Sequence, residues 1–522
     1  MAKSIFFRGL MLCSFSLVEV FVILWCSFGY LWSVGGLEEG SFIVVALFEW
    51  ECFEGLINDG DYELHDDSIL HAPVSDISIK RSDDFQIYVT TKSREAVRCN
   101  RVNYPLGTVR ENQETTKIVS KFSSREIVLR GVGATSYTIS SDFRQGGVFE
   151  ETAYIHSVEG CFLSPENGCY LFEWVENIDA SYFYWPRIIT LSREETITVS
   201  FEDEVPEICL SEKKIGKGGS ERRGVKLSID GNELYVSKVS GERSGRAFIM
   251  YKGCPSDEVR NKIRDCISFC LGRPIIYLGN TILDKKLSLV SFSAISAYSF
   301  NGAAINLPIC PPVCLGERDK TKISEIKLNL LVKGLYGIYD KHNVRGLFWQ
   351  YWHAVCSPVH SAPVQFGSCI EALTNSILRI NKRAVKTKIL EEMDWKAFAK
   401  EADKMLLHLD ICEEGKKVIR KKISSLNSAP QKLVNERVYE FLNLEFTEME
   451  KVVWERRNAA AHGRGGEEKN HAALIRENKI LRILFHRLLI KVSGGCDQYI
   501  DFYTINHPIR LIETGIPSDV VD

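Results

Sequence analysis

CPPVCLGERDK, residues 310–320, divides this chain into two parts with different patterns of apolar residues. Prolines and a glycine interrupt regular structure here. Before this segment, from about residue 40, short β-branched and aromatic runs alternate with Gly, Asp, Asn and Ser, as in antiparallel sheets. After it, apolar residues recur at three- and four-residue intervals, as in amphipathic helices. The sequence therefore predicts an α+β protein in which a β-rich N-terminal domain precedes an all-α bundle.

The individual runs can be assigned to residue ranges. We expect strands at 41–53, 84–91, 116–122, 125–132, 196–201, 225–239, 247–253 and 274–295, with one helical insert at 255–272. We expect helices at 322–342, 362–380, 394–409, 432–444, 448–462 and 477–494. Short connections between consecutive helices imply a bundle. The predicted domains are 35–315, which is β-rich, and 316–522, the helical bundle.

Composition narrows the class of protein. The 522 residues are 45% hydrophobic and 25% charged, which is typical of a globular chain of several domains. The formal net charge of −3 hides an asymmetry, because residues 316–522 carry 33 Lys and Arg against 27 Asp and Glu. A basic half beside an acidic one weakly favours contact between the basic half and a nucleic acid.

The 16 cysteines indicate neither a zinc site nor a disulfide framework. They are spread along the chain and no CxxC occurs, whereas structural zinc requires paired short spacings. We therefore expect a reduced, cytoplasmic protein with no metal and no cofactor. The glycine- and lysine-rich residues 212–224 lack the spacing of a phosphate-binding loop and are expected to be a solvated loop.

The N-terminal segment, residues 1–34, is unusually apolar. Residues 9–34 contain one charged residue, Glu19, and are long enough to cross a bilayer. A membrane anchor, a start codon placed too early and a segment that packs within the fold all remain open. The flanking charges would export the rest of the chain, so we expect that this segment is not an anchor in the working protein.

The segment WERRNAAAHGRGG, residues 454–466, raises a question of chemistry. Alanine favours a helix, and the glycines that follow end it, so His462 is expected to be its last side chain. Arg457 and His462 would point about 140° apart on an ideal helix, whereas Asn458 and His462 share a face. A joint action of Arg457 and His462 therefore requires a bent arginine side chain, a frayed helix end or a second subunit.

The segment Arg457-Asn458-Ala459-Ala460-Ala461-His462 resembles the R-N-x-x-x-H motif of the HEPN ribonuclease superfamily. GSCIEALTNSIL (367–378) resembles an earlier helix of that family, and residues 486–513 resemble the tail of its Apea-like branch. In that branch a β-rich N-terminal domain precedes the HEPN bundle, and residues 37–64 and 172–187 are faintly similar to such domains. The resemblance implies a regulated endoribonuclease, a toxin or anti-phage defence effector, that assembles as a homodimer and responds to an activating ligand or protein.

The residue types of the motif suit this chemistry. RNA carries its own nucleophile, the 2′-hydroxyl, so cleavage to a 2′,3′-cyclic phosphate needs no metal. Histidine can transfer protons near pH 7, and the arginine fork matches two phosphate oxygens. We therefore expect Arg457 and His462 to be catalytic and Asn458 to support them. Both lie near a predicted helix end, so we expect that either can be replaced without unfolding the protein.

Two basic stretches are candidates for RNA contact. A run of charges is commonly a solvated face, and phosphate contact is the alternative. The candidate residues are Arg379, Lys382, Arg383, Lys386 and Lys388 in the first stretch, and Lys416, Lys417, Arg420, Lys421 and Lys422 in the second. The alternative function is a non-catalytic protein that binds nucleic acid or a partner through its bundle, with membrane association possible through residues 9–34.

Other histidines are assigned structural roles. His353 and His360 flank Cys356, lack a fourth metal ligand and are expected in an aromatic core. His486 lies in an apolar helix and is expected to be buried. No G-x-S-x-G motif occurs, so a serine-hydrolase elbow is not indicated.

Overall fold

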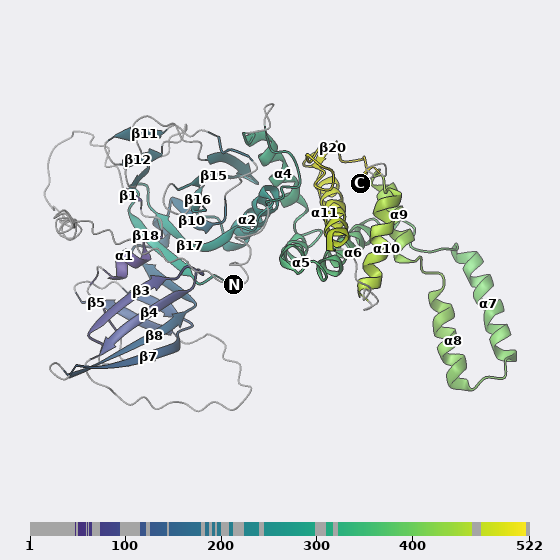
Figure 1. The fold of residues 1–522 in the computed structure, drawn as a ribbon, viewed down its shortest axis with the longest axis horizontal. Coiled ribbons are helices and arrows are strands. Elements are labelled where there is room, and N and C mark those ends of the chain that lie inside the picture. Colours follow the sequence, from purple (N-terminus) through teal and green to yellow (C-terminus); the bar gives the residue numbers. More distant parts are fainter. Residues whose placement is uncertain are drawn as a thin grey trace, which may run out of the picture. The chain divides into compact units, whose positions relative to one another are not determined.

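The predicted α+β organisation is confirmed by a computed structural model of the protein (Figure 1). Strands dominate up to Ile295, and helices run from Glu325 to Ser493. The structure describes residues 47–48, 51–58, 60, 62–64, 74–93, 115–121, 126–142, 146–178, 183–186, 190–193, 196–199, 208–211, 224–239, 245–297, 309–316, 322–461 and 471–517. The loop 212–223 and the apolar segment 9–34 lie outside these residues, so the expectations made for them are not addressed.

A ten-stranded sheet forms the centre of the N-terminal half, and all its neighbouring strands are antiparallel. Its strand order is β14-β15-β16-β10-β17-β18-β9-β6-β5-β2. Seven of these strands, β5, β6 and β14 to β18, lie in predicted runs to within one residue. The bounds are β2 Tyr62–Leu64, β5 Thr115–Ser120, β6 Glu126–Arg130, β9 Ser157–Cys161, β10 Tyr170–Glu176, β14 Gly224–Ile229, β15 Asn232–Lys238, β16 Ala247–Lys252, β17 Ile276–Leu283 and β18 Leu289–Ile295.

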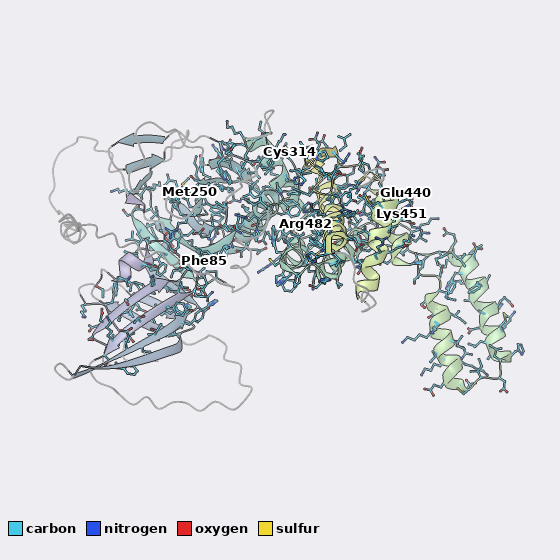
Figure 2. The ribbon with its side chains drawn as sticks, viewed as in Figure 1. Phe85, Met250, Cys314, Glu440, Lys451 and Arg482 are labelled. Atoms are coloured by element: carbon cyan, nitrogen blue, oxygen red, sulfur yellow. The ribbon has the colours of Figure 1, made fainter. Side chains whose placement is uncertain are left out.

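Smaller sheets accompany it. One has the order β3-β4-β8-β7, with β3 Asp76–Arg81, β4 Ile87–Ser93, β7 Gly133–Asp142 and β8 Gly146–Ile155. Another has the order β1-β13-β12-β11, with β1 Leu47–Phe48, β11 Thr190–Arg193, β12 Thr196–Val199 and β13 Ile208–Ser211. Near the C-terminus β19 Gln498–Ile500 pairs with β20 Ile509–Leu511. The first four-stranded sheet shares a buried cluster with the ten-stranded sheet, to which Phe85 and Met250 belong (Figure 2).

The predicted strand over 41–53 is wrong at its C-terminal end. Among the described residues of this range, Leu47–Phe48 form β1, and Phe53 begins the short helix α1, Phe53–Asn58. Phe53 and Ile57, four residues apart, both point into the core from one face of that helix. The alternation of apolar and polar residues expected of a strand is therefore replaced by helical spacing.

Helix α2, Asp257–Leu271, matches the predicted insert and is fastened to the sheet. The Ser256 side chain caps its first turn, and Gly272 ends it with a φ of 72°, which favours glycine. Arg260 and Arg264 of α2 both donate to the fully buried carboxylate of Glu173 on β10. Burial of this carboxylate is compatible with folding because two guanidinium groups compensate its charge.

A single buried core continues from the ten-stranded sheet through α2 into the helices. The Phe269 ring of α2 stacks on Phe348, with 4.9 Å between ring centroids, and meets the edge of Tyr351 at 5.6 Å. It also contacts Phe485, whose centroid lies 6.2 Å away. Apolar packing therefore crosses the proposed boundary at residues 315 and 316, and the division of the chain into domains there stays a prediction.

Within residues 322–461 and 471–517, six helices lie where the sequence predicts them and two do not. Helices α5 and α8 had been interpreted only as an aromatic stretch and a charge run. The bounds are α4 Glu325–Ile338, α5 Val344–Cys356, α6 Ala362–Ile380, α7 Glu392–His408, α8 Glu413–Ser425, α9 Gln431–Phe441, α10 Glu448–Ala461 and α11 His471–Ser493. Helices α6, α10 and α11 pack against one another.

A buried ion pair joins α10 to α11. The Arg487 guanidinium on α11 is fully buried and donates from Nη1 to Oε1 of Glu450 on α10, 2.8 Å away. Its other nitrogens donate to the carbonyl oxygens of Ile512, Glu445 and Glu513. Glu450 also accepts from the Thr447 backbone N–H, which completes a capping box at the start of α10.

No helix among the described residues is both long and apolar enough to cross a lipid bilayer.

Glu450→Ala is expected to lower the free energy of unfolding by about 3–5 kcal/mol, because Arg487 would keep a buried charge without its partner. Chemical denaturation followed by circular dichroism measures the change. Glu448→Ala is the matched control, since the side chain of Glu448 is 81% exposed and pairs with Lys451 at the surface. We expect that control to leave the free energy of unfolding almost unchanged, because solvent screens an exposed ion pair. Equal losses in both variants would show that the buried pair contributes nothing specific.

Candidate functional site

Helix α10 carries the first five residues of the R-N-x-x-x-H motif, from Arg457 to Ala461. It starts at the capping box of Thr447 and Glu450 and ends at Ala461. Arg457 is described in full, whereas Asn458 is described only as part of the helix backbone. His462 lies outside the described residues, so its distance from Arg457 is not addressed.

Arg457 is held in the interface between α10 and α6. The residue is 7% exposed, and its Nη2 forms an ion pair with Oε1 of Glu371 on α6. Its guanidinium also lies over the ring of Trp454, one turn earlier, with Cζ 3.8 Å from the ring centroid. A cation over an indole face is attracted by the ring quadrupole, so this contact orients the guanidinium as well.

The absence of a side chain at Gly367 leaves room for Arg457. A Cβ atom at Gly367 would overlap Nη1 and Cδ of Arg457. Gly367 and Glu371 lie four residues apart on α6 and therefore on the same face of that helix. Neither residue was predicted from the sequence to take part in the site. The available signal was a glycine and a carboxylate at helical spacing within an otherwise apolar segment.

The expectation that Arg457 lies outside the core is wrong. It precedes the last residue of α10 by four positions and is buried against Trp454 and Glu371. Arg457→Ala would leave a cavity and an uncompensated carboxylate, so it is expected to destabilise the protein as well as remove a charge. Arg457→Lys, which keeps the charge, is the better probe of chemistry.

Part of the positive charge of Arg457 is compensated within the protein. Glu371 neutralises one edge of the guanidinium, and within the described residues the buried Nε has no hydrogen-bond partner. The Glu371 side chain is 36% exposed, so solvent reaches the pair from the Glu371 side. An anion that approached from that side could share the guanidinium with Glu371.

The three histidines that the sequence assigns to structural roles, His353, His360 and His486, differ in burial. His486 is buried as expected, shares a hydrogen bond of 2.8 Å with the Tyr351 hydroxyl, and has its pKa lowered well below the usual value by burial and by Arg482. His353 packs beside Trp349 with 4.2 Å between ring centroids. His360, which we expected in an aromatic core, is instead exposed, and its ring centroid lies 6.0 Å from that of the exposed His471.

The two basic stretches occupy surface positions. Arg379 ends α6, Lys382 to Lys388 follow it, and the second stretch lies on α8. All of these side chains are exposed except that of Lys416, which is partly buried. Several of them already have an acidic partner: Lys386 pairs with Glu391, Lys416 with Glu413 and Arg420 with Asp403.

Asn427 brings the ends of the two stretches together. Its side-chain oxygen accepts from the backbone N–H groups of Ile389 and Leu390, and Ala429 donates to the Thr387 carbonyl oxygen. Helices α7 and α8 form a hairpin whose two ends are thereby joined (Figure 1). Arg379 lies twelve residues beyond Gly367 on α6, about 18 Å along the helix, so the basic stretches and Arg457 do not share one site.

Within the described residues, no group of three or more His, Cys, Asp or Glu side chains is arranged to hold a metal ion. Comparisons with models of protein families, with curated proteins and with solved structures find no match to this chain.

Gly367→Ala is expected to displace Arg457 and to lower stability by about 1–3 kcal/mol, as overpacked cores do. Gly337→Ala is the matched control, because Gly337 also lies within a helix but has open space where the Cβ would be. That control should be neutral or more stable by up to about 1 kcal/mol. Thermal unfolding of the two variants measures the difference. A Gly367→Ala protein as stable as Gly337→Ala would mean that Arg457 is not confined there.

Proposed function

We propose that this protein is a metal-independent endoribonuclease of the HEPN type, whose β-rich N-terminal half regulates it as in a toxin or an anti-phage defence effector. The observation that carries the proposal is the arginine of the R-N-x-x-x-H motif, whose guanidinium is oriented by Glu371, Trp454 and the space at Gly367. A fixed cation near a developing phosphorane charge stabilises the transition state more than a mobile one does.

Each motif residue has a distinct role in this proposal. Arg457 stabilises the charge that grows on the phosphate oxygens. His462 transfers a proton during attack by the 2′-hydroxyl, for which an imidazole is suited near neutral pH. Asn458 orients His462 or binds the phosphate from the same helix face. The exposed bases of residues 379–388 and of α8 bind flanking phosphates, with a contribution that falls as salt rises.

A second function is favoured by a specific observation. Arg457 is buried and already paired with Glu371, as a purely structural arginine would be. In that alternative the bundle binds nucleic acid or a partner without cleaving it, and the motif stabilises the packing of α10 on α6. The alternative predicts RNA binding that depends on the basic stretches and no cleavage at all.

The proposed ribonuclease should cut RNA in the presence of EDTA and leave a 2′,3′-cyclic phosphate. His462→Ala is expected to slow cleavage by about 10²–10⁴-fold, the usual contribution of a general acid–base. Arg457→Lys should also cleave more slowly, because an ammonium cannot make the bidentate phosphate contact. Asn458→Ala should have a milder effect. Single-turnover cleavage of end-labelled RNA measures these rates.

The control substrate carries deoxyribose at the expected cleavage position and should remain intact. Equal cleavage of that substrate would exclude attack by the 2′-hydroxyl. Wild-type cleavage rates in the His462→Ala protein would exclude the proposed assignment. RNA binding without cleavage by the wild-type protein would support the second function.

We also expect a homodimer whose site combines Arg457 of one chain with His462 of the other, because the two side chains diverge on one helix. Light scattering should report twice the 59.3 kDa of the chain. If the sites are composite, mixing the Arg457→Lys and His462→Ala proteins should restore cleavage after subunit exchange. A monomer with full activity would contradict a composite site.

A further inference from the structure

The end of α10 and the start of α11 lie at the same end of the helical bundle. Glu450 contacts Arg487, and Arg456, six residues later on α10, contacts Glu477, ten residues earlier on α11. The two helices are therefore antiparallel. Continuing this register brings Ala461, the last residue of α10, level with His471, the first residue of α11.

The start of α6 reaches the same end. Asn478 of α11 donates to the Val359 carbonyl oxygen at 2.9 Å, and the guanidinium of Arg482, labelled in Figure 2, lies over the Phe366 ring at 5.6 Å. Because later residues of α11 contact later residues of the 359–366 segment, α6 and α11 run in the same direction. His360 consequently lies beside His471.

The two histidines form an accessible pair. Their ring centroids are 6.0 Å apart with an angle of 54° between the ring planes, and both residues are exposed. Each ring comes from a different segment, and neither contributes to the hydrophobic core.

The charges around this pair are few. Residues 357–370, which precede and begin α6, contain no charged side chain. The last two turns of α10 and the first two turns of α11 contribute Glu455, Arg456, Arg457, Arg476 and Glu477. Of these, Arg456 pairs with Glu477 and Arg457 with Glu371. With Glu371 counted beside Arg457, three basic and three acidic side chains balance, so the described residues at this end of the bundle are close to neutral overall.

RNA cleavage through the 2′-hydroxyl needs two proton transfers. One group takes the proton of the 2′-hydroxyl as the bond from the 2′-oxygen to phosphorus forms. Another gives a proton to the 5′-oxygen as the bond from phosphorus to that oxygen breaks. The motif supplies one imidazole, His462, which leaves the other transfer unassigned.

We propose that His360 and His471 carry out this second proton transfer, a proposal that rests on the ribonuclease function proposed above. The pair lies level with the end of the helix that bears the motif, on the two segments that flank it. One imidazole of the pair gives its proton to the leaving 5′-oxygen, while His462 gains the proton of the 2′-hydroxyl, so no oxidant, reductant or metal enters the step.

The test is the double variant His360→Ala/His471→Ala in the full chain, with RNA as substrate. We expect kcat to fall at least about 100-fold, as for loss of a general acid or base, and one limb of the bell-shaped pH–rate profile to disappear. The Kd for RNA should change little. The two single variants identify the imidazole that carries the proton, since its loss alone reproduces the effect.

Two controls separate chemistry from structure. His360→Gln/His471→Gln keeps polar side chains of similar size but cannot transfer protons, so it should lose as much activity as the alanine variant. His408→Ala removes an exposed histidine from the last turn of α7 and should cleave as the wild type does.

The outcomes distinguish this proposal from the function on which it rests. Cleavage by the double variant at nearly the wild-type rate, with both limbs of the pH profile intact, would overturn the second proton transfer alone if His462→Ala remained inactive. Absence of cleavage by the wild-type protein would overturn both proposals.

Discussion

A buried guanidinium organises the C-terminal half of the molecule. Arg487 cannot remain charged inside a core without partners, so Glu450 and three backbone carbonyl oxygens must all be delivered to it. Glu450 in turn fixes the first turn of α10, and the carbonyl groups come from the segments before α10 and after β20. One charge thus determines the register of α10 on α11 and the path of the C-terminal tail. The positions of Arg457 and of the end of α10 follow from that register.

Much of the fold is visible in local patterns. The strands over 225–239 and 247–253 and the helix over 362–380 were predictable because alternation, turn residues and helical spacing are all strong there. Helix α5 was missed because its aromatic residues lie on most of its surface, and α8 because its inner positions, Ile419 and Ile423, are outnumbered by lysines. Helix α1 was missed because a run of apolar residues fits either spacing over so short a length.

The candidate site shows where sequence reasoning reaches its limit. The motif indicated Arg457, but nothing local says that a carboxylate 86 residues earlier will pair with it. Likewise His360 and His471 are 111 positions apart and meet only because α6 and α11 share a direction. Such pairs depend on helix register, which buried contacts such as Arg487 with Glu450 determine. Propensity and periodicity describe one helix at a time and carry no information about register.

The joined ends of the α7–α8 hairpin have an evolutionary consequence. The chain leaves the bundle near Thr387 and returns near Ala429. There the Asn427 side chain and a backbone hydrogen bond hold the outgoing and returning segments together. Almost no side chain of α7 or α8 is buried. A segment with neighbouring ends and little buried surface can be lengthened, replaced or lost without disturbing its host. Related chains are therefore free to differ most between α6 and α9 while keeping the rest of the bundle unchanged.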